Sequence, residues 1–212
     1  MSEAVPACPL CSNASARELS EARNYWHCPA CDLRFLHPQL RLSPDAEKAR
    51  YDLHTESDGH RTFLEPAANA ISVRVSAGAE GLDFGCGPFP VLSDILKERG
   101  FRMSTYDPYF APDTACLQRT YDFITATEVA EHLYHPEQVF AELLNLLRPN
   151  GHLALMTLLV QPTTDFSKWY YRLDPTHVVF YSQITFNWVA QRFGFSDVVF
   201  PNERMVLLTR GP

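Results

Sequence analysis

Several features are missing from this sequence, and each absence excludes a class of protein. No apolar run approaches the roughly 18–20 residues that a membrane-spanning helix requires. The N-terminal residues Met-Ser-Glu-Ala-Val-Pro contain neither the basic stretch nor the apolar core of an export signal. No internal repeat or low-complexity tract is visible. These absences predict a globular protein of the cytoplasm with no membrane span.

Basic residues are also scarce. The chain of 212 residues has 18 Lys and Arg against 25 Asp and Glu, a formal net charge of −7. The first 50 residues hold 6 basic and 6 acidic side chains, and the remainder hold 12 and 19. Neither part has the basic excess with which proteins bind a phosphate backbone. The charge balance counts against a nucleic-acid partner without excluding one.

Four of the six cysteines lie in two Cys-x-x-Cys pairs separated by 16 residues. They are Cys8, Cys11, Cys28 and Cys31. This spacing is typical of a tetrahedral zinc site. A disulfide framework is the alternative, but it is disfavoured in a chain without an export signal. We predict a small zinc ribbon over residues 1–42, in which four thiolates close around a structural Zn²⁺ and leave no open position for catalysis.

After the ribbon, strand-like and helical patterns alternate. Strands are predicted at residues 81–84, 102–106, 123–127, 152–159, 197–200 and 205–209, and helices at 44–53, 61–77, 91–99, 136–147 and 183–193. Such alternation is typical of right-handed βαβ units and a mostly parallel sheet. We expect a break at residues 57–59 and a turn at residues 148–151. Residues 161–179 form an insertion without clear periodicity.

The most informative segment is Gly-Leu-Asp-Phe-Gly-Cys-Gly at residues 81–87, where two glycines lie between a strand and an amphipathic helix. Glycine lets the backbone turn sharply and lets a ligand approach the main chain. The next strand ends at Asp107, whose carboxylate can accept hydrogen bonds from both hydroxyls of a ribose. Alternatively, Asp107 only forms a turn before Pro108. A dehydrogenase motif would need glycine where the chain has Pro90, so the segment predicts a different nucleotide cofactor.

Together, five segments resemble the class I S-adenosylmethionine-dependent methyltransferases. They are residues 82–87, 106–107, 121–124, 128–133 and 147–151. The resemblance implies an α/β fold over residues 43–212, with a Rossmann-like, mostly parallel seven-stranded sheet that ends in an antiparallel C-terminal hairpin. It implies that the cofactor is S-adenosyl-L-methionine. The chain departs from the family at Phe89, which replaces the third glycine of the motif.

The resemblance also assigns cofactor-binding roles. The candidates are Tyr51, Asp83, Gly85, Cys86, Gly87, Asp107 and Glu128. In the family, the segment that matches residues 83–87 wraps the methionine part of the cofactor. The acid that matches Asp107 holds the ribose, and a tyrosine ahead of the first strand, here Tyr51, often covers the cofactor.

Residues 128–133 carry the candidate catalytic groups. If they turn helically, Glu128, Glu131 and His132 share one face. Two carboxylates and an imidazole can hold a divalent metal ion there, or His132 can act alone as a base. Similar Glu-x-x-Glu-His segments bind a divalent metal in ubiquinone-pathway O-methyltransferases and in small-RNA 2′-O-methyltransferases, where a later histidine completes the site. Here His177 is the candidate second base or fourth ligand. The alternative is that these side chains only cap a helix and form local hydrogen bonds.

The insertion at residues 161–179 is rich in aromatic side chains. Loops at this end of such a sheet usually carry specificity, and aromatic rings there can line a pocket for a flat or apolar substrate. The candidate substrate-loop residues are Trp169, Tyr170, Tyr171 and Asp174. The alternative is that the rings only pack beneath a lid.

We predict a methyltransferase that modifies oxygen, carbon or nitrogen of a small-molecule acceptor. His132 or His177 would remove the acceptor's proton, with or without a divalent metal. Two other functions stay open. One is an RNA-modifying methyltransferase that docks RNA on the zinc ribbon. The other is a non-catalytic cofactor-binding module, which the departure from the motif at Phe89 favours.

Overall fold

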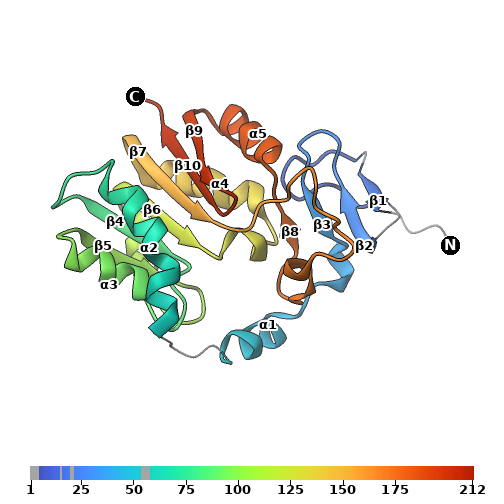
Figure 1. Cartoon of the computed structure of the whole chain (residues 1–212), viewed down its shortest axis with the longest axis horizontal. Helices are drawn as coiled ribbons and strands as arrows, with labels where there is room; N and C mark the ends of the chain where they lie inside the picture. Colours follow the sequence, from blue (N-terminus) through green and yellow to red (C-terminus); the bar gives the residue numbers. More distant parts are fainter. Residues whose placement is uncertain (1–4, 15, 20–21, 54–57) are drawn as a thin grey trace.

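Two β-sheets form the framework of the computed structural model, which describes residues 5–14, 16–19, 22–53 and 58–212 (Figure 1). Among these residues the larger sheet has six strands in the order β5-β4-β6-β7-β10-β9. Four strands run parallel: β4 (Glu80–Phe84), β5 (Arg102–Tyr106), β6 (Tyr121–Thr127) and β7 (Leu147–Met156). The hairpin of β9 (Phe195–Asn202) and β10 (Met205–Arg210) joins β7 antiparallel. The mostly parallel sheet and its antiparallel C-terminal hairpin are therefore confirmed.

Helices cover both faces of this sheet. One face packs on α2 (Asp58–Ser72) and α3 (Val91–Glu98), and the other on α4 (Pro136–Leu146) and α5 (Gln183–Phe193). Neighbouring strand residues alternate between the two cores, because successive side chains of a strand point to opposite faces. Phe123 packs toward α2 and α3, whereas Ile124 packs toward α4 and α5. This doubly wound arrangement leaves the carboxyl ends of the parallel strands open for a ligand.

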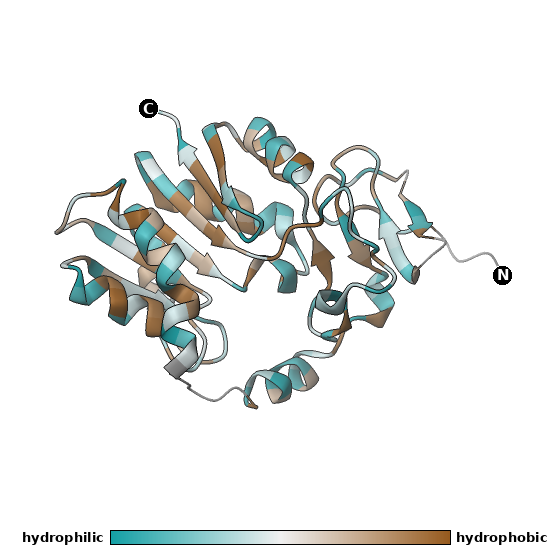
Figure 2. Ribbon diagram, in the orientation of Figure 1, coloured by the Kyte–Doolittle hydropathy of each residue, from teal (hydrophilic) through white to brown (hydrophobic). Residues whose placement is uncertain are grey.

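The distribution of hydropathy follows these layers (Figure 2). The central strands are largely hydrophobic, and the helices carry hydrophobic and hydrophilic residues side by side. Such amphipathic helices bury one stripe on a sheet and expose the other to water. Among the described residues, no helix combines the length and the apolar character that crossing a membrane would require.

The expectation of a seventh strand in this sheet is wrong for the described residues. Between β5 and β6 the chain forms turns and the short 3₁₀ helix η2 (Thr114–Gln118). Only residues 107–120 connect these strands, and they include Pro108 and Pro112. A further parallel strand would need two crossover connections of a dozen or more residues each. The sheet therefore ends at β5.

Several element boundaries also differ from the prediction. Helix α1 (Pro44–Tyr51) ends two residues early, and α2 already begins at Asp58. The expected break at residues 57–59 is wrong where the structure describes it, and residue 57 lies outside the described residues. Strand β7 begins at Leu147, so the predicted turn is an irregular part of this strand, in which Asn150 has a positive φ of 61°. The pairing of β7 with β6 shifts register at this point.

The second sheet joins the N-terminal ribbon to the insertion. Its strands are β1 (Arg17–Leu19), β2 (Ala22–His27), β3 (Arg34–Leu36) and β8 (Val179–Phe180), in that order and all antiparallel. Figure 1 shows β8 between the ribbon and the larger sheet. The boundary at residue 42 stays a prediction, but the ribbon's sheet includes a strand from residues far beyond it.

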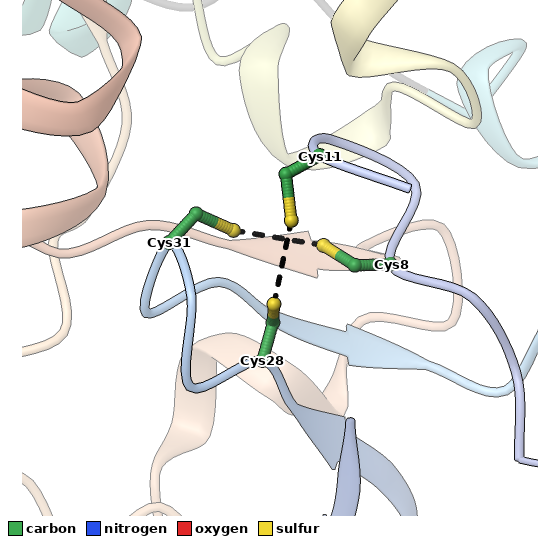
Figure 3. Close-up of side chains that lie close together, drawn as sticks. All are labelled: Cys8, Cys11, Cys28 and Cys31. Atoms are coloured by element: carbon green, nitrogen blue, oxygen red, sulfur yellow. Dashed lines mark hydrogen bonds between the residues drawn. The ribbon is translucent and has the colours of Figure 1, made fainter. Parts of the chain in front are cut away.

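The four paired cysteines converge at one point beside this sheet (Figure 3). Cys8 Sγ lies 3.6 Å from Cys31 Sγ, and Cys11 Sγ lies 3.5 Å from Cys28 Sγ. Four sulfurs at about 2.3 Å from a tetrahedral Zn²⁺ would be about 3.8 Å apart, so the cluster matches such a site closely. Each pair also forms the same tight turn, since the residue after each second cysteine donates its N–H to the carbonyl of the first at 2.9 Å.

The thiols of the cluster differ in acidity, since the hydrogen bond with Cys31 lowers the pKa of Cys8 to about 6. Burial raises the pKa of Cys11 to about 12. The pKa of Cys31 is also raised, first by its hydrogen bond with Cys8 and then by burial. Cys8 therefore ionises before Cys11 and Cys31, and a bound Zn²⁺ holds such sulfurs as thiolates. The four cysteines therefore fit the predicted structural zinc.

Removing zinc is expected to lower the melting temperature by about 5–15 °C, because the site crosslinks the ribbon and a metal bound only by the folded state stabilises it. Differential scanning calorimetry before and after chelation, followed by readdition of Zn²⁺, measures the effect. Cys11→Ser should reproduce the loss, whereas Cys116→Ser should retain one zinc per chain. Equal melting temperatures with and without the metal would contradict a structural role.

Candidate active site

A cavity of about 820 Å³ opens at the carboxyl ends of β4, β5 and β6. Helix α1, the start of α2 and the insertion close its sides. The predicted site residues that line it are Tyr51, Asp83, Gly85, Cys86, Gly87, Asp107, Glu128, His132, Asp174 and His177. The fold thus gathers residues from across the chain at the edge where open α/β sheets bind ligands.

The glycine turn forms one wall of the cavity. Gly85 and Gly87 have positive φ angles of 73° and 64°, a conformation that L side chains rarely adopt. A Cβ on Gly85 would also lie 2.4 Å from Cγ2 of Val129. The N–H of Gly85 donates to the carbonyl of Tyr106 at 2.7 Å, which fixes the turn to the end of β5. Both glycines are therefore required by the backbone.

Asp107 is buried beside this turn. Its Oδ2 accepts a hydrogen bond from the N–H of Gly87 at 3.0 Å. Its Oδ1 accepts from the N–H groups of Tyr109 and Phe110, at 2.8 and 3.0 Å. The carboxylate therefore shapes its own turn, as the alternative interpretation held, and also lines the cavity. Its contact with a ribose stays a prediction.

Asp83 lies beneath the glycine turn. Burial raises the pKa of its carboxyl to about 6, although the hydrogen bond from Thr125 acts in the opposite direction. That bond runs from Thr125 Oγ1 to Asp83 Oδ1 over 2.8 Å. The carboxyl is fixed where the main chain leaves β4 to enter the turn.

Residues 128–133, the segment with the two acids, form less helix than the sequence predicted. Only Ala130–His132 forms a single 3₁₀ turn, η3, while Glu128 precedes it with a positive φ of 52°. Ligand atoms of Glu131, His132 and His177 lie within 4.8 Å of one another, in a group that does not include Glu128. The insertion thus brings His177, the predicted fourth ligand, next to Glu131 and His132, while Glu128 lies outside this group.

Two carboxyl groups lie together at this cluster, that of Glu131 fully buried and that of Glu128 half-buried, and both accept from the same hydroxyl. Tyr171 Oη donates to Glu128 Oε2 at 3.1 Å and also to Glu131 Oε1. Burial and the charge of Glu131 raise the pKa of Glu128 to about 8, and burial raises the pKa of Glu131. Among the described residues, Glu128 Oε1 and Glu131 Oε2 are buried without a hydrogen bond. A proton or a cation is therefore needed to compensate this pair, and the guanidinium of Arg204, 3.6 Å from Glu128 Oε1, supplies part of that charge.

The two histidines are oriented by main-chain carbonyls of the insertion. His132 Nδ1 lies 3.0 Å from the carbonyl oxygen of Thr176, and His177 Nδ1 lies 2.6 Å from that of Tyr171. Because a carbonyl only accepts, this geometry assigns the proton of each neutral ring to Nδ1 and the lone pair to Nε2. Burial, and next the neighbouring His132, lower the pKa of His177 to about 4. His177 is therefore neutral at pH 7.

Glu131, His132 and His177 offer one oxygen and two nitrogen donors, the set that many divalent transition metals take. The Nδ1 hydrogen bonds supply the outer support with which metal-binding histidines are usually held. The unpaired oxygen of Glu131 matches a position next to a cation. These residues therefore fit the divalent metal that the sequence suggested.

The predicted substrate loop does not present its aromatic rings to the cavity. Tyr171 is buried beneath the carboxyl pair, Trp169 packs on Phe166 and Phe180, and Tyr170 is exposed. None of these three predicted rings lines the cavity, and the loop contributes Asp174, Thr176 and His177 instead. Trp169 and Tyr171 therefore pack against other side chains, as the alternative interpretation of the loop predicted.

Sequence reasoning missed a buried acid on α1. Glu47 lines the cavity and accepts hydrogen bonds from Tyr51 Oη at 3.1 Å and Tyr109 Oη at 2.8 Å. These bonds fasten α1 to the loop after β5, and the Tyr51 ring lies edge-on to His132, with 5.4 Å between centroids. In the sequence, Glu47 has no signal other than that of an acid in the first turn of a helix.

A second missed residue is Arg204, in the turn between β9 and β10. Its guanidinium lies 3.6 Å from Glu128 Oε1 and donates to Tyr170 Oη at 2.7 Å. It therefore partly compensates the charge of the buried pair. No motif in the sequence connects this turn with the acidic segment.

Comparison with known proteins agrees with this architecture. A family model described as a methyltransferase domain matches residues 40–199. A ubiquinone biosynthesis O-methyltransferase of Photobacterium profundum is 35% identical over 83 residues, which cover 39% of this chain and 35% of that protein. The same enzyme of Actinobacillus pleuropneumoniae is 29% identical over 89 residues, 40% of this chain and 38% of that protein. The matched segment thus spans less than two-fifths of these relatives.

Solved structures match over a larger share of the chain. The 1,6-didemethyltoxoflavin-N1-methyltransferase of Burkholderia thailandensis has a TM-score of 0.55 and 13% identity, over 88% of this chain and 99% of that one. A methyltransferase of calicheamicin biosynthesis, with bound S-adenosylhomocysteine (SAH), has a TM-score of 0.55 and 13% identity, over 72% of this chain and 54% of that one. At these identities the similarity shows the fold alone.

Tyr171→Phe is expected to lower the free energy of unfolding by about 1–3 kcal/mol, because two carboxyl groups, one of them fully buried, lose their common donor. Urea denaturation at pH 7 measures the loss. Tyr170→Phe removes the same hydroxyl from an exposed ring and should change stability by less than about 0.5 kcal/mol. Equal effects of the two substitutions would contradict the role of Tyr171.

Proposed function

Because the chain belongs to the family of methyltransferase domains, we propose that it transfers a methyl group from S-adenosyl-L-methionine to a small-molecule acceptor. One observation carries this proposal. The cavity of about 820 Å³ has the glycine turn on one wall and the Glu131–His132–His177 cluster beside another. Binding sites for small molecules and cofactors occupy about 300–1,000 Å³, so a cavity of this size suits a cofactor together with a small acceptor.

The cofactor would lie against the glycine turn. Residues 85–87 allow its close approach, and Asp107 presents a buried carboxylate beside them. Tyr51 on α1 would cover it from the opposite side. We retain Asp83, Cys86 and the backbone at Glu128 as further contacts, because all three line the same cavity.

Gly85→Ala is expected to weaken SAH binding at least tenfold, because the new Cβ would clash with Val129 and strain a backbone with positive φ. Isothermal titration calorimetry measures the affinity. Gly194→Ala is the matched control: Gly194 also has a positive φ, 86°, but a Cβ there would meet nothing within 4 Å. Its affinity for SAH should stay within twofold of the parent. Absence of SAH binding by the zinc-loaded parent protein would overturn the cofactor assignment.

Methyl transfer from a sulfonium requires no covalent bond between the protein and the methyl group. The bond from the methyl carbon to the sulfonium sulfur breaks as the bond to the acceptor forms, and the sulfonium becomes a neutral thioether. The protein must align the acceptor and take its proton. His177 is suited to this role because burial keeps it neutral, and Nε2 carries its lone pair. His132 presents its Nε2 in the same way.

In the alternative form of the site, Glu131, His132 and His177 would hold a divalent metal, and the Nε2 lone pairs of the two histidines would then be ligands rather than bases. Glu128 lies nearby as a further acid. Such an ion supplies Lewis-acid polarisation of an acceptor oxygen. The names of the curated relatives make oxygen our first choice of acceptor atom. We also propose a cytoplasmic location, because a reducing compartment keeps the four zinc-binding cysteines as thiols.

His177→Ala and Glu131→Gln are each expected to reduce methyl transfer about 100-fold or more while leaving SAH affinity within twofold, since both act on the acceptor side. The assay follows labelled methyl groups from S-adenosylmethionine into a cell extract that is then separated into small molecules, RNA and protein. His152→Ala, at a histidine that does not line the cavity, is the control.

We expect label in the small-molecule fraction. Label only in RNA would replace the proposal with the RNA-modifying alternative. Full transfer by both variants would contradict the acceptor-side assignment, and absence of transfer together with intact SAH binding would favour a non-catalytic module.

A further inference from the structure

The strand that follows His177 belongs to the zinc ribbon's sheet. Phe35 of β3 pairs with Val179 of β8, and Arg34 pairs with Phe180. The N–H of Leu36 extends this pairing, since it donates to the carbonyl of Val178 at 2.8 Å. The residue next to His177 is therefore held by the ribbon.

The same residue is held from the other side by the acidic segment. The N–H of Val178 donates to the carbonyl of Glu131 at 2.8 Å, and Val178 is fully buried. Tyr181, at the end of β8, donates from Oη to the carbonyl of Ala130 at 3.0 Å. Strand β8 thus pairs with the ribbon, while Val178 and Tyr181 on either side of it are hydrogen-bonded to η3.

A side chain beside the zinc ligands holds the far end of this strand. Asp32 follows Cys31 directly, and its Oδ2 accepts a hydrogen bond from Oγ of Ser182. Ser182 is the N-cap of α5, and its backbone carbonyl accepts from Phe186. The Oδ1 of Asp32 lies 2.7 Å from His27 Nε2, which orients the carboxylate. The turn that presents Cys28 and Cys31 therefore also fixes where β8 ends.

The cofactor side of the cavity is held by other contacts. The glycine turn is fastened to Tyr106 and Asp107, within the larger sheet. Among the described residues that line the cavity, none comes from β1, β2, β3 or the cysteine turns. The cysteine turns and β3 therefore reach the site through β8, on the wall that carries His177, while the end of the ribbon makes separate hydrogen bonds to Tyr134 through Arg41 and Leu42.

We propose that the zinc ribbon positions His177 against Glu131 and His132, so that methyl transfer depends on the ribbon whereas cofactor binding does not. Zinc fixes the Cys28–Cys31 turn, this turn and β3 fix β8, and β8 fixes His177. Asp32 is a positioning residue in this chain of contacts. The inference rests on the function proposed above for the Glu131–His132–His177 cluster.

A matched pair of variants tests the proposal. Asp32 and Ser12 each follow the second cysteine of a pair and have φ angles of 60° and 59°, so glycine at either position keeps the backbone unstrained. Asp32→Gly removes the link to Ser182, whereas Ser12→Gly removes only an exposed hydrogen bond to Glu137. Asp32→Asn, which keeps an acceptor oxygen for Ser182, serves as the rescue.

We expect Asp32→Gly to retain one zinc per chain and SAH affinity within twofold, while kcat for methyl transfer falls tenfold or more. Ser12→Gly should match the parent, and Asp32→Asn should recover most of the rate. Amide hydrogen exchange of residues 178–182, read by mass spectrometry, should become at least tenfold faster in Asp32→Gly, with β4 and β6 unchanged.

The exchange readout separates this inference from the proposed function, because it needs no acceptor. Unchanged exchange at residues 178–182 would overturn the inference even if the parent protein methylates a small molecule. A parallel loss of SAH affinity and transfer would also overturn it, since the ribbon would then act on the whole fold. Faster exchange in a protein that transfers no methyl group would support the link from the ribbon to β8 and count against the proposed reaction.

Discussion

The burial of the Glu131 carboxyl group beside a second acid is the constraint on which the rest of the site depends. Glu131 is fully buried and Glu128 lies beside it. Removing an ionised carboxylate from water costs on the order of several kcal/mol unless a donor, a proton or a cation compensates its charge. Tyr171 supplies one donor to both acids, and Arg204 approaches Glu128 from the β9–β10 turn. The inward position of the insertion follows from this requirement.

The two halves of the cavity are built by different means. The half proposed for the cofactor is local, since the glycine turn, Asp83 and Asp107 all lie at the ends of adjacent parallel strands. The half proposed for the acceptor joins segments that are distant in sequence, namely η3 and the insertion, with the ribbon behind β8. Local geometry can bind a common cofactor, whereas the distant segments can differ from one family member to another.

This division explains what could be predicted from the sequence. The glycine turn was recognisable because strand, turn and helix follow one another directly, and the cysteine cluster because its spacing is regular. The pairing of β8 with β3 was not, because Val179–Phe180 is too short for a periodic pattern. Composition also could not distinguish a buried Tyr171 from one that faces a substrate. The bonds of Glu47 to Tyr51 and Tyr109 depend on how α1 folds back, which no local signal records.

The two ends of the insertion are hydrogen-bonded to each other. The N–H of Val160 donates to the carbonyl of Tyr181 at 2.8 Å, and Val160 also bridges to Ser182. The residues between them include the 3₁₀ helix η4 (Tyr170–Leu173) and strand β8, and the closure of the remaining loop is already fixed by the sheet. Doubling the length of such a loop costs only about 0.6 kcal/mol in closure entropy. Phe166 and Trp169 pack against Phe180 and are fixed, so the stretch that can change in length without moving the histidine at the loop's end is residues 162–165.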